Sequence, residues 1–572
     1  MAVGERSTVA TRTIPALWRR ATSAGRTEPA YLVQGESGWE AVSWEEAGRR
    51  ADELAHGFLA LGLRKGDAFA ILGNTRLEWA LVNFALAQIG VVVIPVYPTS
   101  SPADCAYVLG HSEALGIICE DDEMRDRIEG IRDQTQLERL LTFDDLDELA
   151  ARGRDHAAAN PGALGELSAG IAEDDVLTIV YTSGTTGPPK GCIMLHKNYA
   201  AVVDALSEIH INLAGDVVLL FLPLAHTYAQ LVLYDAAGIG FTVAFCPDIL
   251  RVAEALEEVH PSGMPSVPRV YEKVHAAVTA KLDEATGVQR RIADWALRVG
   301  YRASRVRQQG RALPPGLALQ RRIADKLVYS KVKERLGGRL RAGVSGAAPI
   351  SVEILEFFHA MDILILEGYG LTESSSGCSV NREDNFRFGT VGLPLPGIQV
   401  QIADDGEILV RGDNVFAGYY KDEEATRRAI DEDGWLHTGD VGTLDDDGFL
   451  RVTDRKKDII VTAGGKNVAP QNLENDLKRV PGISQAVVVG DRRPYLVALI
   501  TVEPGVADPE PLAQAAVDEV NRERTRYEQI KKFIVLERDF SPELGEVTPT
   551  MKLRRKAIVE RFADDIDRLY AG

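Results

Sequence analysis

Short apolar runs rich in β-branched residues alternate with helical patterns through most of this chain. The clearest runs are residues 68–72, 91–96, 115–119, 176–181, 217–222, 241–245 and 363–366. Continuous apolar runs between helices are typical of largely parallel strands in a sheet that is covered on both faces. The pattern predicts an α/β fold with helix-covered sheets, and 572 residues are too many for a single hydrophobic core.

Two later segments have a different pattern of predicted strands, turns and helices. Between residues 391 and 450, short strands are separated by Gly, Asp-Gly and Asn turns, which predicts a small β-rich subdomain. We therefore expect an N-terminal domain of residues 1–455, which contains this subdomain, and a small α+β C-terminal domain of residues 456–572. The strand candidates of the C-terminal domain are residues 486–489, 495–502 and 533–536.

Composition excludes several classes of protein. The formal net charge of −20 argues against nucleic acid as the main partner. The five cysteines are scattered without a CxxC pair, which indicates free buried thiols in a reducing cytoplasm. Residues 1–15 lack the apolar core of a signal peptide, and no stretch approaches the ~20 apolar residues of a membrane-spanning helix. We expect a cytoplasmic protein that does not cross a membrane.

A polar loop directly follows the apolar run at residues 176–181. Residues 180–191 read VYTSGTTGPPKG and combine hydroxyl groups, glycines and Lys190. Glycines let the backbone approach phosphate oxygens, hydroxyls and amides donate hydrogen bonds, and the lysine supplies a positive charge. A flexible surface turn would rarely be so dense in phosphate-binding groups. The loop therefore predicts a phosphate site.

Other catalytic motifs fail on their spacing. Counted from Gly184, a P-loop would need glycine at Pro189 and Ser or Thr at Gly191. Residues 368–373 have glutamate where a dinucleotide fingerprint needs its third glycine, and residues 343–347 lack the last glycine of a nucleophile elbow. No HExxH or other metal-ligand spacing is present. These spacings argue against a P-loop protein, a dehydrogenase, a serine hydrolase and a metallohydrolase.

Six motifs in order resemble those of the adenylate-forming superfamily, which includes acyl-CoA synthetases, firefly luciferase and peptide-synthetase adenylation domains. They are residues 181–191, 346–349, 368–373, 438–440, 454–458 and 549–553. The resemblance spans nearly the whole chain. It implies a large adenylation domain and a mobile C-terminal domain that rotates about a hinge near Lys457. It also implies the chemistry: a carboxylate attacks the α-phosphate of ATP, and the acyl-adenylate then passes its acyl group to a thiol.

The resemblance assigns a nucleotide site. Tyr369 offers a flat face to adenine, Asp440 accepts hydrogen bonds from the ribose hydroxyls, and Arg455 reaches ribose or phosphate. Glu373 and Thr185 are implied ligands of Mg²⁺, a cation that prefers oxygen ligands. The full set implied for ATP and AMP is Thr182, Ser183, Gly184, Thr185, Thr186, Gly187, Lys190, Gly346, Ala347, Ala348, Gly368, Tyr369, Gly370, Thr372, Asp440 and Arg455.

The resemblance also assigns catalytic roles. The transition state spreads negative charge over phosphate oxygens. Catalysis therefore depends mainly on cations and hydrogen-bond donors that are positioned to stabilise this charge. Lys552 is expected to bridge the carboxylate and the α-phosphate, while Lys190 and Thr185 serve the phosphates. His226 is placed beside the acyl carboxylate, with a purely structural histidine as the alternative. Lys466 is assigned to the thioester step. For the hinge residue, Lys457, the alternative is an ordinary surface lysine.

Within the superfamily, the chain most resembles the bacterial long-chain fatty acid CoA ligases. The similar segments are residues 223–226, 266–273, 456–467 and 548–555, together with inserted helices at about 274–340. The resemblance implies a ligase that uses ATP, Mg²⁺ and coenzyme A to convert a fatty acid to acyl-CoA. At residues 548–555 the chain reads TPTMKLRR, whereas most superfamily members have Thr-Gly-Lys there; the departure fits the long-chain branch.

Three alternatives remain open at this stage. The chain could load a carrier protein instead of coenzyme A, or activate another hydrophobic acid. It could also bind the nucleotide or the acyl-adenylate without turnover, although the joint presence of Lys190, Glu373, Asp440, Arg455 and Lys552 argues against this. The depth of the acyl pocket is expected to depend on distant segments that include residues 228–240 and 343–346.

One segment differs from the rest in charge. Residues 290–341 contain fifteen Lys or Arg against three Asp or Glu, in a chain that is acidic overall. Such a run is usually a solvated helical face. The sharper hypothesis is a docking surface for anionic lipid headgroups, which attract basic helices and would give the protein a peripheral contact with the membrane.

Overall fold

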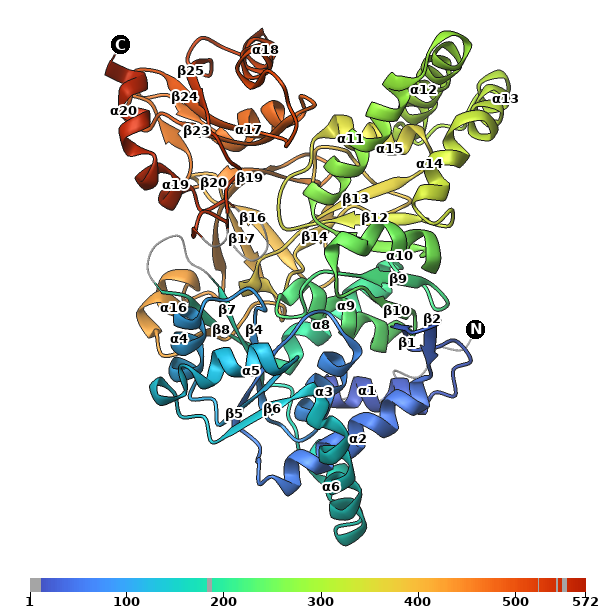
Figure 1. Ribbon diagram of the computed structural model, residues 1–572, viewed down its shortest axis with the longest axis vertical. Helices are drawn as coiled ribbons and strands as arrows, with labels where there is room; N and C mark the ends of the chain where they lie inside the picture. Colours follow the sequence, from blue (N-terminus) through green and yellow to red (C-terminus); the bar gives the residue numbers. More distant parts are fainter. Residues whose placement is uncertain (1–11, 183–187, 523, 542–543, 548–552, 572) are drawn as a thin grey trace.

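The computed structural model describes residues 12–182, 188–522, 524–541, 544–547 and 553–571 (Figure 1). Its largest sheet has nine strands in the order β15-β14-β13-β12-β11-β9-β10-β1-β2, and its strands from β13 to β1 run parallel. The strands are β1 (Tyr31–Gly35), β2 (Gly38–Val42), β9 (Val217–Leu220), β10 (Thr242–Phe245), β11 (Gly263–Ser266), β12 (Ala342–Ser345), β13 (Leu364–Tyr369), β14 (Ser379–Val380) and β15 (Leu393–Pro394).

A second sheet has seven strands in the order β18-β8-β7-β4-β3-β5-β6. The members from β7 to β6 are parallel, whereas β8 and β18 are antiparallel additions at one edge. The strands are β3 (Ala68–Leu72), β4 (Val92–Val96), β5 (Gly116–Cys119), β6 (Arg139–Thr142), β7 (Val176–Thr182), β8 (Lys190–Leu195) and β18 (Gly418–Tyr419).

The strand β3 shows why these apolar runs are continuous. Phe69 and Ile71 belong to one buried cluster, whereas Ala70 and Leu72 belong to another on the opposite face. Because successive side chains point to opposite faces of a strand, both faces are apolar only where both are covered. The cluster with Phe69 and Ile71 is the larger one. It also includes buried residues of the nine-stranded sheet and of the helices α3 (Leu77–Gln88), α8 (His196–Ile209) and α9 (Thr227–Ile239). The expectation of helix-covered sheets is confirmed.

Strand bounds agree with the predicted runs to within a few residues at each end. The run predicted at residues 217–222 ends as a strand at Leu220. The carbonyl of Leu222 accepts a hydrogen bond from Thr75 Oγ1 at 2.7 Å, so it is used outside the sheet. All five cysteines are free and buried. None of the helices in the described ranges combines the length and apolar composition that a bilayer-spanning segment needs.

The segment after β15 forms a four-stranded antiparallel sheet in the order β16-β17-β19-β20. Its strands are β16 (Gln399–Ile402), β17 (Glu407–Arg411), β19 (Leu436–Leu444) and β20 (Leu450–Arg455). The sheet therefore extends to Arg455, a few residues beyond the bound of about 450 that the turn pattern predicts.

Helices α11 (Pro268–Glu284), α12 (Gly287–Gln308), α13 (Pro315–Ala324) and α14 (Ser330–Arg335) form the insertion, with a π-helical turn at Asp325–Tyr329. The insertion begins at Pro268, earlier than the predicted 274, because proline suits the first turn of a helix. Helix α12 packs on α15 (Val352–Ala360). The outer ends of α12 and α13 project from the body of the protein (Figure 1).

The C-terminal unit has its own three-stranded sheet of β23 (Ile483–Val489), β24 (Leu496–Val502) and β25 (Ile530–Val535). A separate buried cluster lies on each face of this sheet. The helices are α17 (Pro470–Lys478), α18 (Pro509–Arg522), α19 (Arg555–Arg561) and α20 (Ala563–Ala571). Polar contacts join the unit to two neighbouring helices. Arg269 Nη2 of α11 donates to Ser484 at 3.0 Å, and Arg479 Nη1 contacts Glu353 of α15 at 2.9 Å.

Candidate active site

A cavity of about 2180 Å³ reaches the carboxyl ends of the parallel strands in the nine-stranded sheet. Residues of β7, β8, the β16–β20 sheet and the C-terminal unit also line it. Open α/β sheets bind their ligands at this edge. The predicted site residues that line the cavity are Thr182, Lys190, His226, Gly346, Ala347, Ala348, Gly368, Tyr369, Gly370, Thr372, Glu373, Asp440, Arg455 and Lys457.

Two of these residues are neighbours across a strand pair, whereas the remaining predicted residues do not line the cavity or lie outside the described ranges. Thr182 and Lys190 lie opposite each other in the antiparallel pair of β7 and β8. Lys466 does not line the cavity; its Nζ lies 5.9 Å from the centre of the Tyr527 ring. Six predicted site residues lie outside the described ranges: Ser183, Gly184, Thr185, Thr186, Gly187 and Lys552.

One buried carboxylate joins the two motifs predicted to hold adenosine. The Tyr369 hydroxyl donates to Asp440 Oδ2 at 2.7 Å, and Arg455 Nε contacts Asp440 Oδ1 at 2.8 Å. Burial, and then the charge of Asp440, raise the pKa of Tyr369 well above its usual value, so the phenol remains a donor. Asp440 and Arg455 also face each other as partners in β19 and β20. The sheet register thus fixes the pair.

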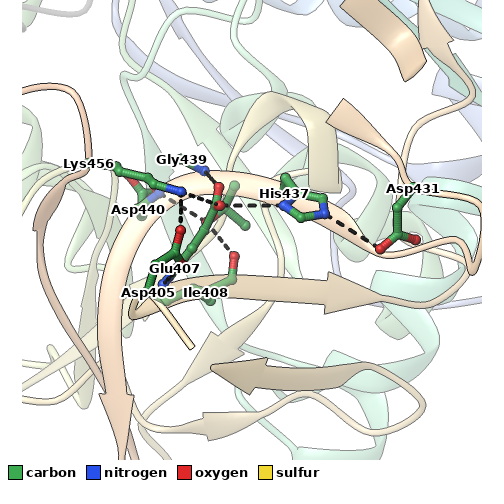
Figure 2. Close-up of polar contacts among 9 residues, drawn as sticks. Asp405, Glu407, Ile408, Asp431, His437, Gly439, Asp440 and Lys456 are labelled. Atoms are coloured by element: carbon green, nitrogen blue, oxygen red, sulfur yellow. Dashed lines mark hydrogen bonds and ion pairs between the residues drawn. The ribbon is translucent and has the colours of Figure 1, made fainter. Parts of the chain in front are cut away.

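The part of β19 that carries Asp440 is held by hydrogen bonds to the neighbouring strand β17. Thr438 Oγ1 donates to the carbonyl of Ile408 at 2.7 Å and accepts from the Asp440 amide at 3.1 Å. The Gly439 amide donates to Glu407 Oε1 at 2.8 Å (Figure 2). Gly439 has φ of +70°, a conformation that glycine adopts without strain. The Thr-Gly-Asp sequence therefore fixes the backbone of β19 at Asp440.

Lys456 fastens the start of the hinge motif to the β16–β20 sheet. Its Nζ contacts Glu407 at 3.0 Å and Asp405 at 2.5 Å (Figure 2). His437 lies between Glu407, at 3.4 Å, and Asp431, at 3.5 Å. Burial opposes ionisation of Glu407, but the hydrogen bonds from Lys456 and the backbone outweigh it and lower its pKa. Glu407 is therefore a charged anchor for Lys456.

A residue outside the predicted set connects Glu373 with Lys190. The Tyr419 hydroxyl donates to Glu373 Oε1 at 2.8 Å, and Lys190 Nζ lies 4.8 Å from the centre of the Tyr419 ring. Lys190 Nζ is also 3.7 Å from Asp422. The two neighbours come from β18 and the turn after it. Because β18 pairs with β8 only in the fold, no local motif marks Tyr419 in the sequence.

His226 has a structural role and also faces the cavity. It is the N-cap of α9, where its Nδ1 accepts a hydrogen bond from the Tyr228 amide at 3.1 Å. A neutral ring that accepts at Nδ1 carries its proton on Nε2, which is then a donor. The Tyr228 hydroxyl donates to the carbonyl of Val344 at 3.2 Å and ties α9 to β12.

Two backbone positions in the cavity wall are tightly specified. A Cβ on Gly370 would lie 2.3 Å from the backbone of Ser376, so no other residue fits without movement. Ala347 has φ of +70°, which is unfavourable for a residue with a side chain. Such strain is often found at ligand sites.

The C-terminal unit reaches the cavity through Leu553 and its neighbours. Leu553 pairs antiparallel with Val547, which also lines the cavity. Arg555 Nη2 contacts both oxygens of buried Glu474, at 2.7 and 2.8 Å, and its Nη1 donates to Val488. Arg555 is thus an internal anchor rather than part of a solvated basic run. Burial, and then the charge of Arg455, lower the pKa of Lys457.

The sequence matches two family models. The model of AMP-binding enzymes matches residues 17–420, and that of the AMP-binding enzyme C-terminal domain matches residues 457–572. Long-chain-fatty-acid–CoA ligase FadD15 of Mycobacterium tuberculosis is 39% identical over 581 residues, covering 95% of each chain. Long-chain-fatty-acid–CoA ligase ACSBG2 of Homo sapiens is 30% identical over 624 residues, covering 98% of this chain and 92% of its own.

Solved structures share the fold. The adenylation domain of a carboxylate reductase from Mycobacterium chelonae superposes with a TM-score of 0.77 at 24% identity, covering 100% of this chain and 92% of that one. A Mycobacterium tuberculosis fatty acyl CoA synthetase gives a TM-score of 0.65 at 23% identity, covering 97% and 99%. At these identities the likeness concerns the fold alone.

Proposed function

The chain belongs to the AMP-binding enzyme family and is an AMP-forming fatty acid–CoA ligase, and we propose that long-chain acids are its preferred substrates. It uses ATP and coenzyme A. The relatives that span nearly the whole chain carry names of long-chain enzymes, which supports the proposed chain length. We also propose that it acts in the cytoplasm.

The observation that carries the nucleotide part of the proposal is the contact of Tyr369 and Arg455 with one buried carboxylate, that of Asp440. A carboxylate offers about four lone-pair sites, so Asp440 can still accept from the ribose hydroxyls while it holds both neighbours. Adenine would then lie on the Tyr369 ring. Lys190 lies on the phosphate side, beside Tyr419.

Two steps follow from this arrangement. A carboxylate oxygen of the fatty acid forms a bond to the α-phosphorus of ATP, and pyrophosphate leaves. The sulfur of coenzyme A then attacks the acyl carbon, its proton is lost, and AMP leaves with the electron pair of the broken C–O bond. In both steps charge develops on phosphate oxygens, which nearby cations and donors stabilise. We assign the donor role beside the acyl carboxylate to Nε2 of His226.

Mg²⁺ would neutralise the phosphate charge when bound. In the described ranges no group of three or more His, Cys, Asp or Glu could hold a metal ion. This fits Mg²⁺, which is often held by one or two carboxylates and the substrate phosphates. We assign that carboxylate to Glu373, which Tyr419 positions through its 2.8 Å hydrogen bond. Thr185 is the proposed companion.

We propose that the C-terminal domain, residues 456–572, changes its orientation between the steps. Lys456 is held by two carboxylates of the β16–β20 sheet, so a rotation must begin after it. This supports a hinge at Lys457. Lys552 precedes Leu553, a cavity residue, and we assign it to the first step. Lys466, which lies away from the cavity here, is assigned to the thioester step after rotation.

We further propose that the insertion contacts anionic lipid. Leu319, Ile323 and Leu327 follow at intervals of four residues and are 60%, 45% and 44% exposed. Residues four apart share one face of a helix, and the exposed Arg322 and Lys326 flank this apolar stripe. Basic and apolar groups together favour a position at the surface of an anionic bilayer.

Vesicle sedimentation tests the lipid contact. Replacing Arg322 and Lys326 by Glu should abolish binding to anionic vesicles. Replacing Arg427 and Arg428 by Glu changes the same charge on exposed residues elsewhere and should leave binding intact. If the wild-type protein does not bind anionic vesicles, the lipid proposal is wrong. It is also wrong if the variant with Glu at positions 322 and 326 binds them as well as wild type.

The ligase activity is tested by ATP–pyrophosphate exchange over a series of straight-chain acids, followed by mass spectrometry after addition of coenzyme A. We expect exchange with a long-chain optimum and an acyl-CoA product. Exchange without acyl-CoA would point to a carrier-protein acceptor instead. Absence of exchange with every fatty acid would exclude fatty acids as the substrate class.

A further inference from the structure

The cavity continues from the nucleotide end along helix α9. Tyr228, Leu231, Val232 and Asp235 line it and recur at helical spacing on one face of α9. The facing wall is β12, where Ala342 and Val344 alternate with residues that point away. Between Tyr228 and Asp235, the lining residues Leu231 and Val232 of α9 are apolar, as are Ala342 and Val344 opposite them, and an aliphatic chain requires such a wall.

The far end of this channel lies at the amino ends of the parallel strands. Val218, Gly263 and Ala342 line it there, and these residues begin or nearly begin β9, β11 and β12. From the N-cap His226 to Asp235 there are nine residues, or about 13 Å along the helix axis. A chain whose carboxylate lies at His226 can therefore extend to Asp235.

Asp235 is a polar group in an apolar wall. It is 1% exposed, and its Oδ2 accepts a hydrogen bond from Asn212 Nδ2 at 2.8 Å. Its other oxygen, Oδ1, is buried and has no hydrogen-bond partner within the described ranges. Asn212 lines the cavity as well. A carboxyl group with one engaged and one unengaged oxygen thus borders the end of the channel.

Among the described residues, no cation forms an ion pair with Asp235. Arg341 lines the same end of the cavity, but its Nη2 contacts Asp216 at 2.7 Å and its Nη1 contacts Glu383. Burial, opposed by the Asn212 hydrogen bond, raises the pKa of Asp235 to about 7. The group therefore exchanges easily between a form that only accepts hydrogen bonds and one that also donates.

We infer that Asp235 and Asn212 form a recognition site for a hydroxyl group on the acyl tail, so that hydroxy fatty acids are a preferred substrate class. The inference rests on the proposed ligase function. A terminal methyl group would leave Oδ1 unsatisfied, whereas a hydroxyl can donate to it. Sites built to hydrogen-bond a substrate hydroxyl discriminate strongly against analogues without it. A charged amine fits less well because it would lose its hydration in this apolar channel.

The test compares kcat/KM for acyl-CoA formation on pairs of acids of equal length, with and without a terminal hydroxyl. At the length that reaches Asp235, we expect wild type to prefer the hydroxy acid roughly 10- to 100-fold. Asp235→Leu should remove or reverse this preference. Asp235→Asn, which retains polar atoms, should keep part of the preference.

A matched control is available on the same helix. The buried Tyr234 hydroxyl accepts a hydrogen bond from Asn83 and lines no part of the cavity, so Tyr234→Phe should leave the preference unchanged. Equal kcat/KM of wild type for both acids at every length would overturn the inference and leave the ligase function intact. That comparison does not depend on whether any variant folds. Failure of both acids to give acyl-CoA or pyrophosphate exchange would instead overturn the proposed function, and the inference with it.

Discussion

The Tyr369 hydroxyl donates a hydrogen bond to Asp440 over 2.7 Å, although the two residues belong to different sheets. Arg455 holds the other oxygen of the same carboxylate at 2.8 Å. The ring proposed for adenine and the acceptor proposed for ribose are therefore positioned as one unit. Because these contacts are made within the chain itself, they reduce the ordering that nucleotide binding requires.

Asp440→Asn should reduce kcat/KM for ATP by about 10²- to 10³-fold, because it removes the counter-ion of Arg455 and replaces one of the two acceptor oxygens by a donor. Tyr369→Phe removes one hydrogen bond and leaves the ion pair, so a loss of about tenfold is expected. Pyrophosphate exchange at varied ATP concentration measures both. An Asp440→Asn enzyme with the ATP dependence of wild type would contradict the assignment.

Tyr419→Phe should raise the Mg²⁺ concentration needed for half-maximal exchange by roughly tenfold, because Glu373 loses the donor that positions it. The phenylalanine ring keeps its packing under Lys190. Phe416→Leu alters a neighbouring ring that contacts Tyr419 but no carboxylate, and serves as the control. If Tyr419→Phe lowers activity equally at all Mg²⁺ concentrations, Tyr419 acts on something other than the metal.

Features that depend on residues close together in the sequence could be predicted, whereas contacts between distant segments could not. The helix-covered sheets follow from apolar runs such as β3, because periodicity is a local property. Tyr369 and Asp440 can likewise be recognised from the short sequence motifs to which they belong. No local pattern marks Tyr419, because the fold brings it to Glu373 through the pairing of β18 with β8 and through the hydrogen bond from the Phe416 amide to the Glu373 carbonyl.

Buried polar groups were harder still to predict. Asp235 reads in the sequence as an ordinary acidic residue of a helix, and its isolation depends on which residues the fold places around it. Arg555 reads as one charge in a basic run, but its partner Glu474 lies on α17, in another part of the C-terminal unit. Burial of a charge is a property of the assembled core, so composition does not reveal it.

Glu367 should make stability depend on pH. It is 6% exposed, and burial, opposed by backbone hydrogen bonds, raises its pKa from 4.5 to about 8. Between these values the native state keeps a proton that the unfolded state has lost, so stability falls as the pH rises through this window and levels off above about 8.

Glu367→Gln removes this titration. Relative to wild type, its melting temperature should therefore increase between pH 5 and pH 8, by roughly 1 °C for each kcal/mol recovered, because a chain of this length has a large unfolding entropy. Thermal unfolding followed by circular dichroism measures the difference. Glu36→Gln, at an exposed position, should show no such trend. A constant offset between Glu367→Gln and wild type across this range would mean that Glu367 does not titrate there.

Lys552→Ala should separate the two half-reactions. Removing a cation that bridges the carboxylate and the α-phosphate should lower acyl-adenylate formation by about 10²-fold or more. Thioester formation from pre-made acyl-adenylate should be largely spared, because the proposed rotation about Lys457 takes Lys552 out of the site. Lys556→Ala changes an exposed lysine of the same basic run, paired with Glu560 at 3.8 Å, and should affect neither step. Equal loss of both steps in Lys552→Ala would rule out this division of roles, since the lysine would then be needed in both orientations of the domain.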